Sequence, residues 1–171
     1  MPSSTSNSPS ARLGVLGVLF LLFSSVTSSN LTYYSPQPGV DPAFANWITE
    51  FYNAAEASNT TAYGYSEFFS TDATINLGGW NPAQDVTDGL IVRVHYPTNV
   101  IPTKDTADTV FDLFGLTKGY YENGTCVVDS YETKFTIQTV NGRANLKPRS
   151  GSLTALNLIE QTVSNQSCDT F

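Results

Sequence analysis

One carboxylate in the sequence stands where an acid or a base could act. Asp129 shares its odd-numbered parity with Val127, Tyr131 and Phe135. Side chains alternate between the two faces of a β-strand, so this parity places Asp129 on the apolar face. A carboxylate removed from water there could serve as a general base or acid. The alternative is that the alternation breaks near the start of the strand, which would leave Asp129 solvated or paired with a lysine or arginine.

The single histidine is the second candidate for chemistry. His95 could carry a proton near neutral pH, and an acid–base dyad of His95 with Asp129 would form if the fold brings the two together. The alternative is a surface or hydrogen-bonded histidine, because no partner stands at a defined spacing from it. The sequence contains no serine-hydrolase elbow and no phosphate-binding glycine loop, and we expect no cofactor.

The strand that carries Asp129 belongs to a series of predicted strands in the last third of the chain. Asn123-Gly124 and Asn141-Gly142 stand between strand-like runs, which is the strongest local signal for a β-hairpin. Between them, Cys126 to Val140 alternates with period two, and its odd positions give Tyr131, Phe135 and Ile137 on the dry face. Thr109 to Tyr121 and Ser152 to Val163 are further strands. We therefore expect a curved antiparallel sheet.

An N-terminal helix is predicted to cover that sheet. Asp41 followed by Pro42 is a strong helix start, and the pattern continues to Ala57. Its apolar residues recur at helical spacing and form one stripe: Phe44, Trp47, Ile48, Phe51 and Ala55. We expect the helix to lie on the dry face, with a pocket lined by Trp47, Phe51, Tyr131, Phe135 and Ile137.

The middle of the chain gives the weakest pattern. A short helical piece is expected to hold Tyr63, Tyr65, Phe68 and Phe69, followed by a turn at Ser70 to Ala73 and a short strand from Thr74 to Leu77. Residues 88–96 fit a helix, or a strand with Leu90, Val92 and Val94 on one side. We favour the helix, followed by a loop from Pro97 to Thr106. Gly115 and Gly119 predict bulges in the next strand.

Composition narrows the classes of partner. Charged residues make up only 13% of the 171, and the formal net charge is −7. The few basic residues are scattered, which argues against nucleic-acid binding, since phosphate contacts need clustered lysines and arginines. Two cysteines far apart and one histidine do not have the spacing of metal ligands, so we expect no metal site.

The N-terminus predicts export. Residues 1–29 read as a secretory signal peptide, with an apolar run from Leu13 to Phe23 and small residues at the cleavage site; a retained signal anchor is the alternative. We expect a secreted, extracellular protein without a membrane segment once the signal is removed. In that compartment Cys126 and Cys168 are expected to form a disulfide, with two free thiols as the alternative. Four sequons predict glycosylation, at Asn30, Asn59, Asn123 and Asn165.

The order of these elements resembles the nuclear transport factor 2-like superfamily, and more narrowly its SnoaL-like branch, as found in small secreted fungal proteins. The resemblance covers about residues 41–160. It is carried by Trp47 and Phe51 of the first helix, by the Phe68-Phe69-x-x-Asp72-Ala73-Thr74 stretch, and by the last three strands. It implies one α+β domain over residues 30–171. Its expected fold is a cone-shaped, curved antiparallel sheet packed against N-terminal helices.

Two functions follow from the resemblance and the residues. The first is a non-catalytic secreted module whose cone pocket holds a small apolar or aromatic molecule, or is filled by its own side chains. The second is a cyclase, isomerase or dehydratase that uses Asp129 with His95, because enzymes of this superfamily use aspartate and histidine as acid or base inside the cone. The resemblance also implies a homodimer formed through the open face of the sheet. An effector acting through its surface is a third alternative.

Overall fold

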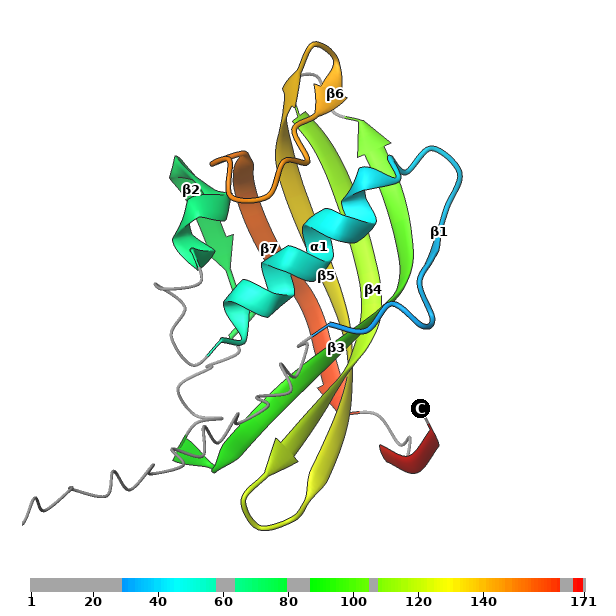
Figure 1. The fold of residues 1–171 in the computed structure, drawn as a ribbon, viewed down its shortest axis with the longest axis vertical. Helices are drawn as coiled ribbons and strands as arrows, with labels where there is room; N and C mark the ends of the chain where they lie inside the picture. Colours follow the sequence, from blue (N-terminus) through cyan, green and yellow to red (C-terminus); the bar gives the residue numbers. More distant parts are fainter. Residues whose placement is uncertain (1–28, 58–63, 80–86, 105–107, 164–167, 171) are drawn as a thin grey trace, which may run out of the picture.

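The structure is a computed structural model that describes residues 29–57, 64–79, 87–104, 108–163 and 168–170. Figure 1 shows one long helix lying across a twisted sheet. The elements, in chain order, are β1 (Ser35–Pro36), α1 (Ala43–Ala55), the 3₁₀ turn η1 (Tyr65–Phe68), β2 (Phe69–Asn76), β3 (Leu90–Lys104), β4 (Asp108–Tyr121), β5 (Cys126–Val140), β6 (Arg143–Ala144), β7 (Leu153–Val163) and the 3₁₀ turn η2 (Cys168–Thr170).

The described strands form one seven-stranded sheet of mixed direction. Its strand order is β1-β3-β4-β5-β7-β2, and β6 pairs with β5. The four long strands β3, β4, β5 and β7 are antiparallel, whereas the edge strands β1 and β2 run parallel to their neighbours. With α1 covering one face, this is the expected α+β cone (Figure 1). None of the helices described is long and apolar enough to cross a membrane.

Helix α1 begins and packs as its sequence predicts. Oδ1 of Asp41 accepts a hydrogen bond from the backbone N–H of Ala43 at 3.0 Å, and Pro42 already has helical backbone angles. A helix of 13 residues is marginal alone in water, so its stability depends on the buried stripe. Phe44 stacks on Phe111 of β4 at 4.2 Å between ring centroids.

The two Asn-Gly pairs make different turns. Asn141 and Gly142 both have positive φ, 52° and 76°, and Val140 pairs directly with Arg143, which makes the expected two-residue hairpin. At the other turn only Gly124 has positive φ, 81°. The N–H of Gly124 donates to the carbonyl of Tyr121, and the connection from β4 to β5 is longer than two residues. Both hairpins exist, but only one has the tight turn that the sequence predicts.

The predicted helix over residues 88–96 and the loop from Pro97 to Thr106 are wrong. Strand β3 runs through both, from Leu90 to Lys104. Proline is tolerated because the register shifts between Pro97 and Asn99, and because β1 covers β3 only at Asn99 and Val100. The extra residues at the register shifts lie on β3, so the bulges predicted at Gly115 and Gly119 of β4 occur on the partner strand instead.

The turn predicted at Ser70 to Ala73 is also wrong, because these residues belong to β2. They fall in the register shift between Phe69 and Thr74, where β2 pairs irregularly with β7. The polar residues there read as a turn in the sequence because the strand lies at the edge of the sheet, where its side chains are largely exposed.

Candidate functional site

A cavity of about 410 Å³ lies where the C-terminal end of α1 meets the sheet. Its wall is mostly apolar, with a few polar side chains contributed by residues of the helix end and of the strands. The lining residues are Phe51, Tyr52, Ala55, Glu56, Tyr65, Ile75, Leu77, Arg93, His95, Thr117, Tyr131, Thr133, Phe135, Leu156, Leu158 and Gln161. This volume is within the range of small-molecule sites in proteins.

Aromatic rings form much of the apolar wall. Phe51 of α1 meets Phe135 of β5 edge to face, with 5.3 Å between ring centroids, and Tyr65 lies 5.4 Å from Phe51. Of the five residues predicted to line a pocket, Phe51, Tyr131 and Phe135 lie in this wall. Trp47 and Ile137 do not: both are fully buried in the core beside it.

Three ionisable side chains gather at one part of the wall. Oε1 of Glu56 lies 3.7 Å from Nη1 of Arg93 and 3.8 Å from Nε2 of His95. The Arg93 and Glu56 side chains are 7% and 16% exposed. Arg93 and His95 stand two residues apart on β3, which places both on the same face of the sheet. Opposite charges therefore compensate each other at the site.

Glu56 occupies an unfavourable place for a carboxylate. It immediately follows α1, and its N–H donates to the carbonyl of Tyr52 as the last bond of the helix. The C-terminal end of a helix carries partial negative charge, which disfavours an anion there. Arg93 offsets this repulsion.

The His95 ring is held in a fixed orientation. Tyr52 stacks on it in parallel, with 3.8 Å between centroids and 7° between planes. Tyr131 approaches it edge-on at 5.7 Å. The His95 carbonyl accepts a hydrogen bond from the backbone N–H of Asn30 at 2.7 Å. Packed between these two rings, the imidazole has its Nε2 3.8 Å from Oε1 of Glu56.

The tyrosines of the site are neutral at physiological pH. Burial raises the pKa of Tyr52 well above its usual value, and the neighbouring Tyr131 hydroxyl and Glu56 carboxylate raise it further. Burial also raises the pKa of Tyr131, and raises that of Tyr65 to about 12. These phenols can pack against a ligand, but they cannot act as bases near neutral pH.

Asp129 lies beside the cavity and not in its wall. It pairs across the sheet with Thr117, which in turn pairs with His95, so the three form a row over β5, β4 and β3. Adjacent strands are about 4.8 Å apart, which puts about 10 Å between the backbones of Asp129 and His95. Oδ2 of Asp129 accepts a hydrogen bond at 3.1 Å from Nε2 of Gln161, a lining residue. The carboxylate that the structure brings to His95 is that of Glu56.

Thr117 lies in the middle of this row, and the environment of its hydroxyl group is unusual. The residue is 4% exposed, and its Oγ1 has no hydrogen-bond partner among the residues described. A buried polar group without a partner destabilises a fold. Its place in the cavity wall, between His95 and Asp129, makes it a neighbour of the site.

Sequence reasoning missed Glu56 and Arg93. Glu56 falls just past the helix, where helical periodicity no longer indicates which way a side chain points. Arg93 lies in the segment predicted to be helical. Its signal was the alternation of Val92 and Val94 with Arg93 and His95, which places the two cationic residue types together on one face of a strand.

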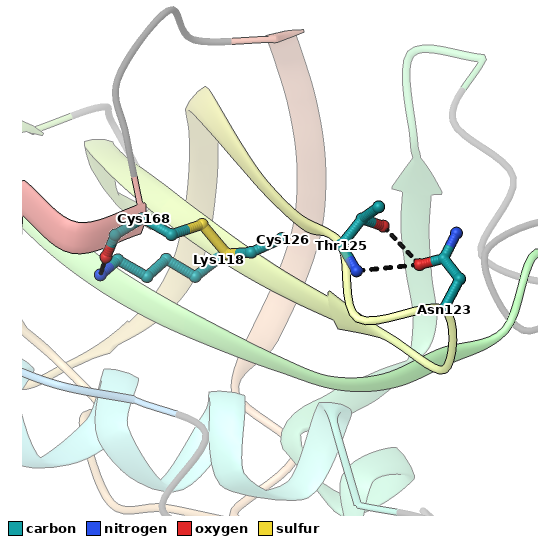
Figure 2. Close-up of a disulfide and its surroundings, with 5 residues drawn as sticks. All are labelled: Lys118, Asn123, Thr125, Cys126 and Cys168. Carbon is teal, nitrogen blue, oxygen red and sulfur yellow. Dashed lines mark hydrogen bonds between the residues drawn. A yellow bond between two sulfur atoms is a disulfide. The ribbon is translucent and has the colours of Figure 1, made fainter.

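The 3₁₀ turn η2 near the C-terminus is fastened to the start of β5. Cys126 and Cys168 form the expected disulfide, with 6.3 Å between their Cα atoms. The ammonium group of buried Lys118 donates to the Cys168 carbonyl, as Figure 2 shows. No cluster of three metal-binding side chains occurs within the described ranges.

Two predicted glycosylation sites can be placed. Oδ1 of Asn123 accepts hydrogen bonds from the N–H and the hydroxyl of Thr125, at 2.9 and 2.7 Å, which leaves its amide nitrogen directed away from the turn (Figure 2). Asn30 and Thr32 make the same pair of bonds. Asn59 and Asn165 lie outside the described residues, as does all of the predicted signal peptide except Ser29.

The sequence matches no protein-family model, and no curated protein matches it. Solved structures show what the fold is similar to. A hexachlorocyclohexane dehydrochlorinase (LinA, type 2) aligns over 71% of this chain and 86% of its own, with a TM-score of 0.50 and 12% identity. Mtr2 of Candida albicans aligns over 74% of this chain and 98% of its own, with a TM-score of 0.50 and 8% identity. Together they support a nuclear transport factor 2-like fold.

Proposed function

We propose that this protein binds a small apolar or aromatic molecule in the cavity between α1 and the sheet. The observation that carries the proposal is the cavity itself: about 410 Å³, with Phe51, Tyr65 and Phe135 in its wall. Burying apolar surface is favourable by about 25 cal/mol for each Å² removed from water, so a ring entering this space gains affinity from the wall.

Filling the cavity tests the proposal. Ala55 lines it from the last turn of α1, whereas Ala43 is exposed at the start of the same helix. We expect calorimetry to show saturable, one-to-one binding of naphthalene to the wild type and to Ala43→Trp. Ala55→Trp should lose that binding while it keeps the circular dichroism spectrum of the wild type. Equal binding by both variants would place the ligand elsewhere and contradict the proposal.

Acid–base catalysis is the second candidate, favoured by the approach of His95 to Glu56 inside the cavity. Neutral His95 would take a proton from a carbon next to a carbonyl group. Glu56 would stabilise the imidazolium that results, and Arg93 would hydrogen-bond the developing enolate oxygen. This is the proton transfer that a SnoaL-like isomerase, cyclase or dehydratase requires. Asp129 would act through Gln161 and not directly on the substrate.

Hydrogen–deuterium exchange tests this second candidate without knowledge of the natural substrate. Tetralone, a bicyclic ketone, exchanges its α-protons slowly in heavy water, and proton magnetic resonance follows the loss of signal. We expect the wild type to accelerate the exchange and His95→Gln to abolish the acceleration. An exchange rate equal to that in buffer, or one unchanged in His95→Gln, would rule out the catalytic role.

We further propose that residues 1–29 are removed on secretion and that residues 30–171 act as one glycosylated, SnoaL-like domain. The Cys126–Cys168 disulfide and the exposed Asn123 turn are consistent with an oxidising, glycosylating compartment. Mass spectrometry of secreted protein, before and after glycan removal, is expected to give a mature N-terminus at Asn30, or at Ser29 where cleavage falls one residue earlier. A homodimer through the sheet is a separate proposal, which light scattering on deglycosylated protein tests.

A further inference from the structure

The polar part of the cavity wall places two opposite charges next to each other. Nη1 of Arg93 is 3.7 Å from Oε1 of Glu56, and both side chains are largely buried. Hydrogen bonds between nitrogen and oxygen are about 2.7 to 3.2 Å long. These two atoms therefore attract each other as an ion pair at more than hydrogen-bond distance. A small group with both a donor and an acceptor can contact the two side chains at once.

A charged ligand gains little from this wall. A carboxylate drawn to Arg93 would also face the carboxylate of Glu56. An ammonium group drawn to Glu56 would face the guanidinium of Arg93. Either ion would also lose its hydration on entering a largely apolar cavity. The paired charges therefore select against ligands that carry a net charge of either sign.

A hydroxyl group suits the same wall. It donates one hydrogen bond and accepts others, and it does both without a charge. It could donate to Oε1 of Glu56 and accept from Nη1 of Arg93. Hydrogen bonds to charged partners are the stronger ones, so an uncharged group gains from both residues. His95, 3.8 Å from Glu56, borders the same position.

The size of the cavity limits the rest of the ligand. A volume of about 410 Å³ lies near the lower end of the range of about 300 to 1,000 Å³ that small-molecule sites occupy. One or two rings fit this space, and the wall around them consists of side chains such as Phe51, Phe135, Leu156 and Leu158.

We propose that the cavity takes an uncharged molecule of one or two rings that bears a hydroxyl group, and that Glu56 and Arg93 hold that hydroxyl between them. The inference rests on the proposed binding function and specifies the chemical class of its ligand.

Four compounds with one ring system test the choice of polar group: naphthalene, naphthylmethanol, naphthoate and naphthylmethylammonium. We expect the wild type to bind naphthylmethanol about tenfold or more tightly than either ion at pH 7, a difference that calorimetry resolves easily. Glu56→Gln should strengthen naphthoate binding about tenfold, and Arg93→Gln should do the same for naphthylmethylammonium.

Glu50→Gln is the matched control. Glu50 lies on the same helix but is 37% exposed and pairs with Arg149, away from the cavity lining. The Glu50→Gln substitution should leave the affinities for all four compounds unchanged. If naphthalene binds and naphthylmethanol binds no more tightly, or if naphthoate binds as tightly as the alcohol, the inference is overturned while the binding function stands. If no compound binds, naphthalene included, the binding function itself is overturned. The affinities of the wild type for the four compounds test the inference even if one substitution prevents folding.

Discussion

The ring of Tyr131 on β5 lies directly over Gly115 on β4. The two residues pair across the sheet, and a β-carbon at Gly115 would come within 2.6 Å of Cζ of the tyrosine and 2.7 Å of the backbone oxygen of Tyr96. The absence of a side chain at Gly115 lets the Tyr131 ring lie at the edge of the cavity and meet the His95 ring edge-on. A glycine inside a central strand is thus part of the site.

Replacing Gly115 with alanine should therefore distort the site and the sheet. Overpacking of this kind destabilises a fold by about 1 to 3 kcal/mol, and we expect that loss in urea unfolding. Gly119→Ala is the comparison, because its nearest new contacts are side-chain atoms at 3.2 Å, which can move. A Gly115→Ala variant as stable as Gly119→Ala would mean that the close approach of Tyr131 is not a constraint.

Thr117→Val should raise stability, which is unusual for a buried substitution. The two side chains have similar shape, and the Thr117 hydroxyl has no partner in the described part of the chain. Removing an unpaired buried group should stabilise the fold by about 1 kcal/mol. Thr154→Val is the control, because the Thr154 hydroxyl donates to the Thr136 carbonyl at 3.1 Å and its loss should destabilise. Thermal unfolding of both variants distinguishes the cases, and a destabilised Thr117→Val would contradict the prediction.

Stability should fall steeply in alkali. Tyr52, Tyr65 and Tyr131 have raised pKa values in the folded protein, with burial as the main cause. Unfolded tyrosines ionise near pH 10, so above that pH the unfolded chain binds fewer protons than the folded one, and the free energy of unfolding declines. Each such tyrosine contributes a slope of about 1.4 kcal/mol per pH unit. The loss begins near pH 10, and the share that Tyr65 contributes ends at about pH 12, where Tyr65 ionises in the folded protein.

Urea unfolding at pH values of about 9, 10 and 11 measures that slope, because this range brackets the ordinary tyrosine pKa. Little change is expected in the lower half of the range, with a marked drop in the upper half. Tyr65→Phe should reduce the slope of the free energy of unfolding against pH by about 1.4 kcal/mol per pH unit, since phenylalanine does not ionise. A midpoint that stays constant over the whole range would mean that these hydroxyls are exposed to water in solution.

Removing the disulfide should destabilise the chain without disrupting the cavity. The bond joins residues 42 positions apart, and the chain-entropy relation gives up to about 4 kcal/mol for a loop of that length. We expect the Cys126→Ser, Cys168→Ser double variant to unfold at lower urea and still to bind naphthalene, because neither cysteine lines the cavity. An unchanged urea midpoint would show that the tail contributes nothing to stability.

The alternation of apolar and polar residues predicts an element well where one of its faces is apolar and buried and the other is polar and exposed. Strand β5 and helix α1 are of this kind, and both were predicted nearly to their observed ends. Strand β3 is not, because Val92 and Val94 are less buried than Arg93 and His95, which point inward. Its alternation is therefore inverted relative to the usual pattern. Its prolines suggest breaks in a strand, but β3 tolerates them because β1 pairs with it over only two residues.

The site was only partly predictable for a related reason. His95 and Asp129 are conspicuous residue types, but the distance between them depends on strand order, which no single segment encodes. Strand β4 lies between β3 and β5, so the two residues stay two strands apart. Glu56 reaches His95 only because the end of α1 lies against β3, a tertiary contact that helical periodicity does not reveal.

The most direct test is a nuclear magnetic resonance titration with naphthalene that follows methyl signals. We expect saturable shifts at Ala55, Leu156 and Leu158, which line the cavity, and none at Ile101 and Val140, which are exposed and away from it. Shifts at Ile101 or Val140, or shifts that grow linearly without saturation, would contradict a ligand-binding cavity between α1 and the sheet.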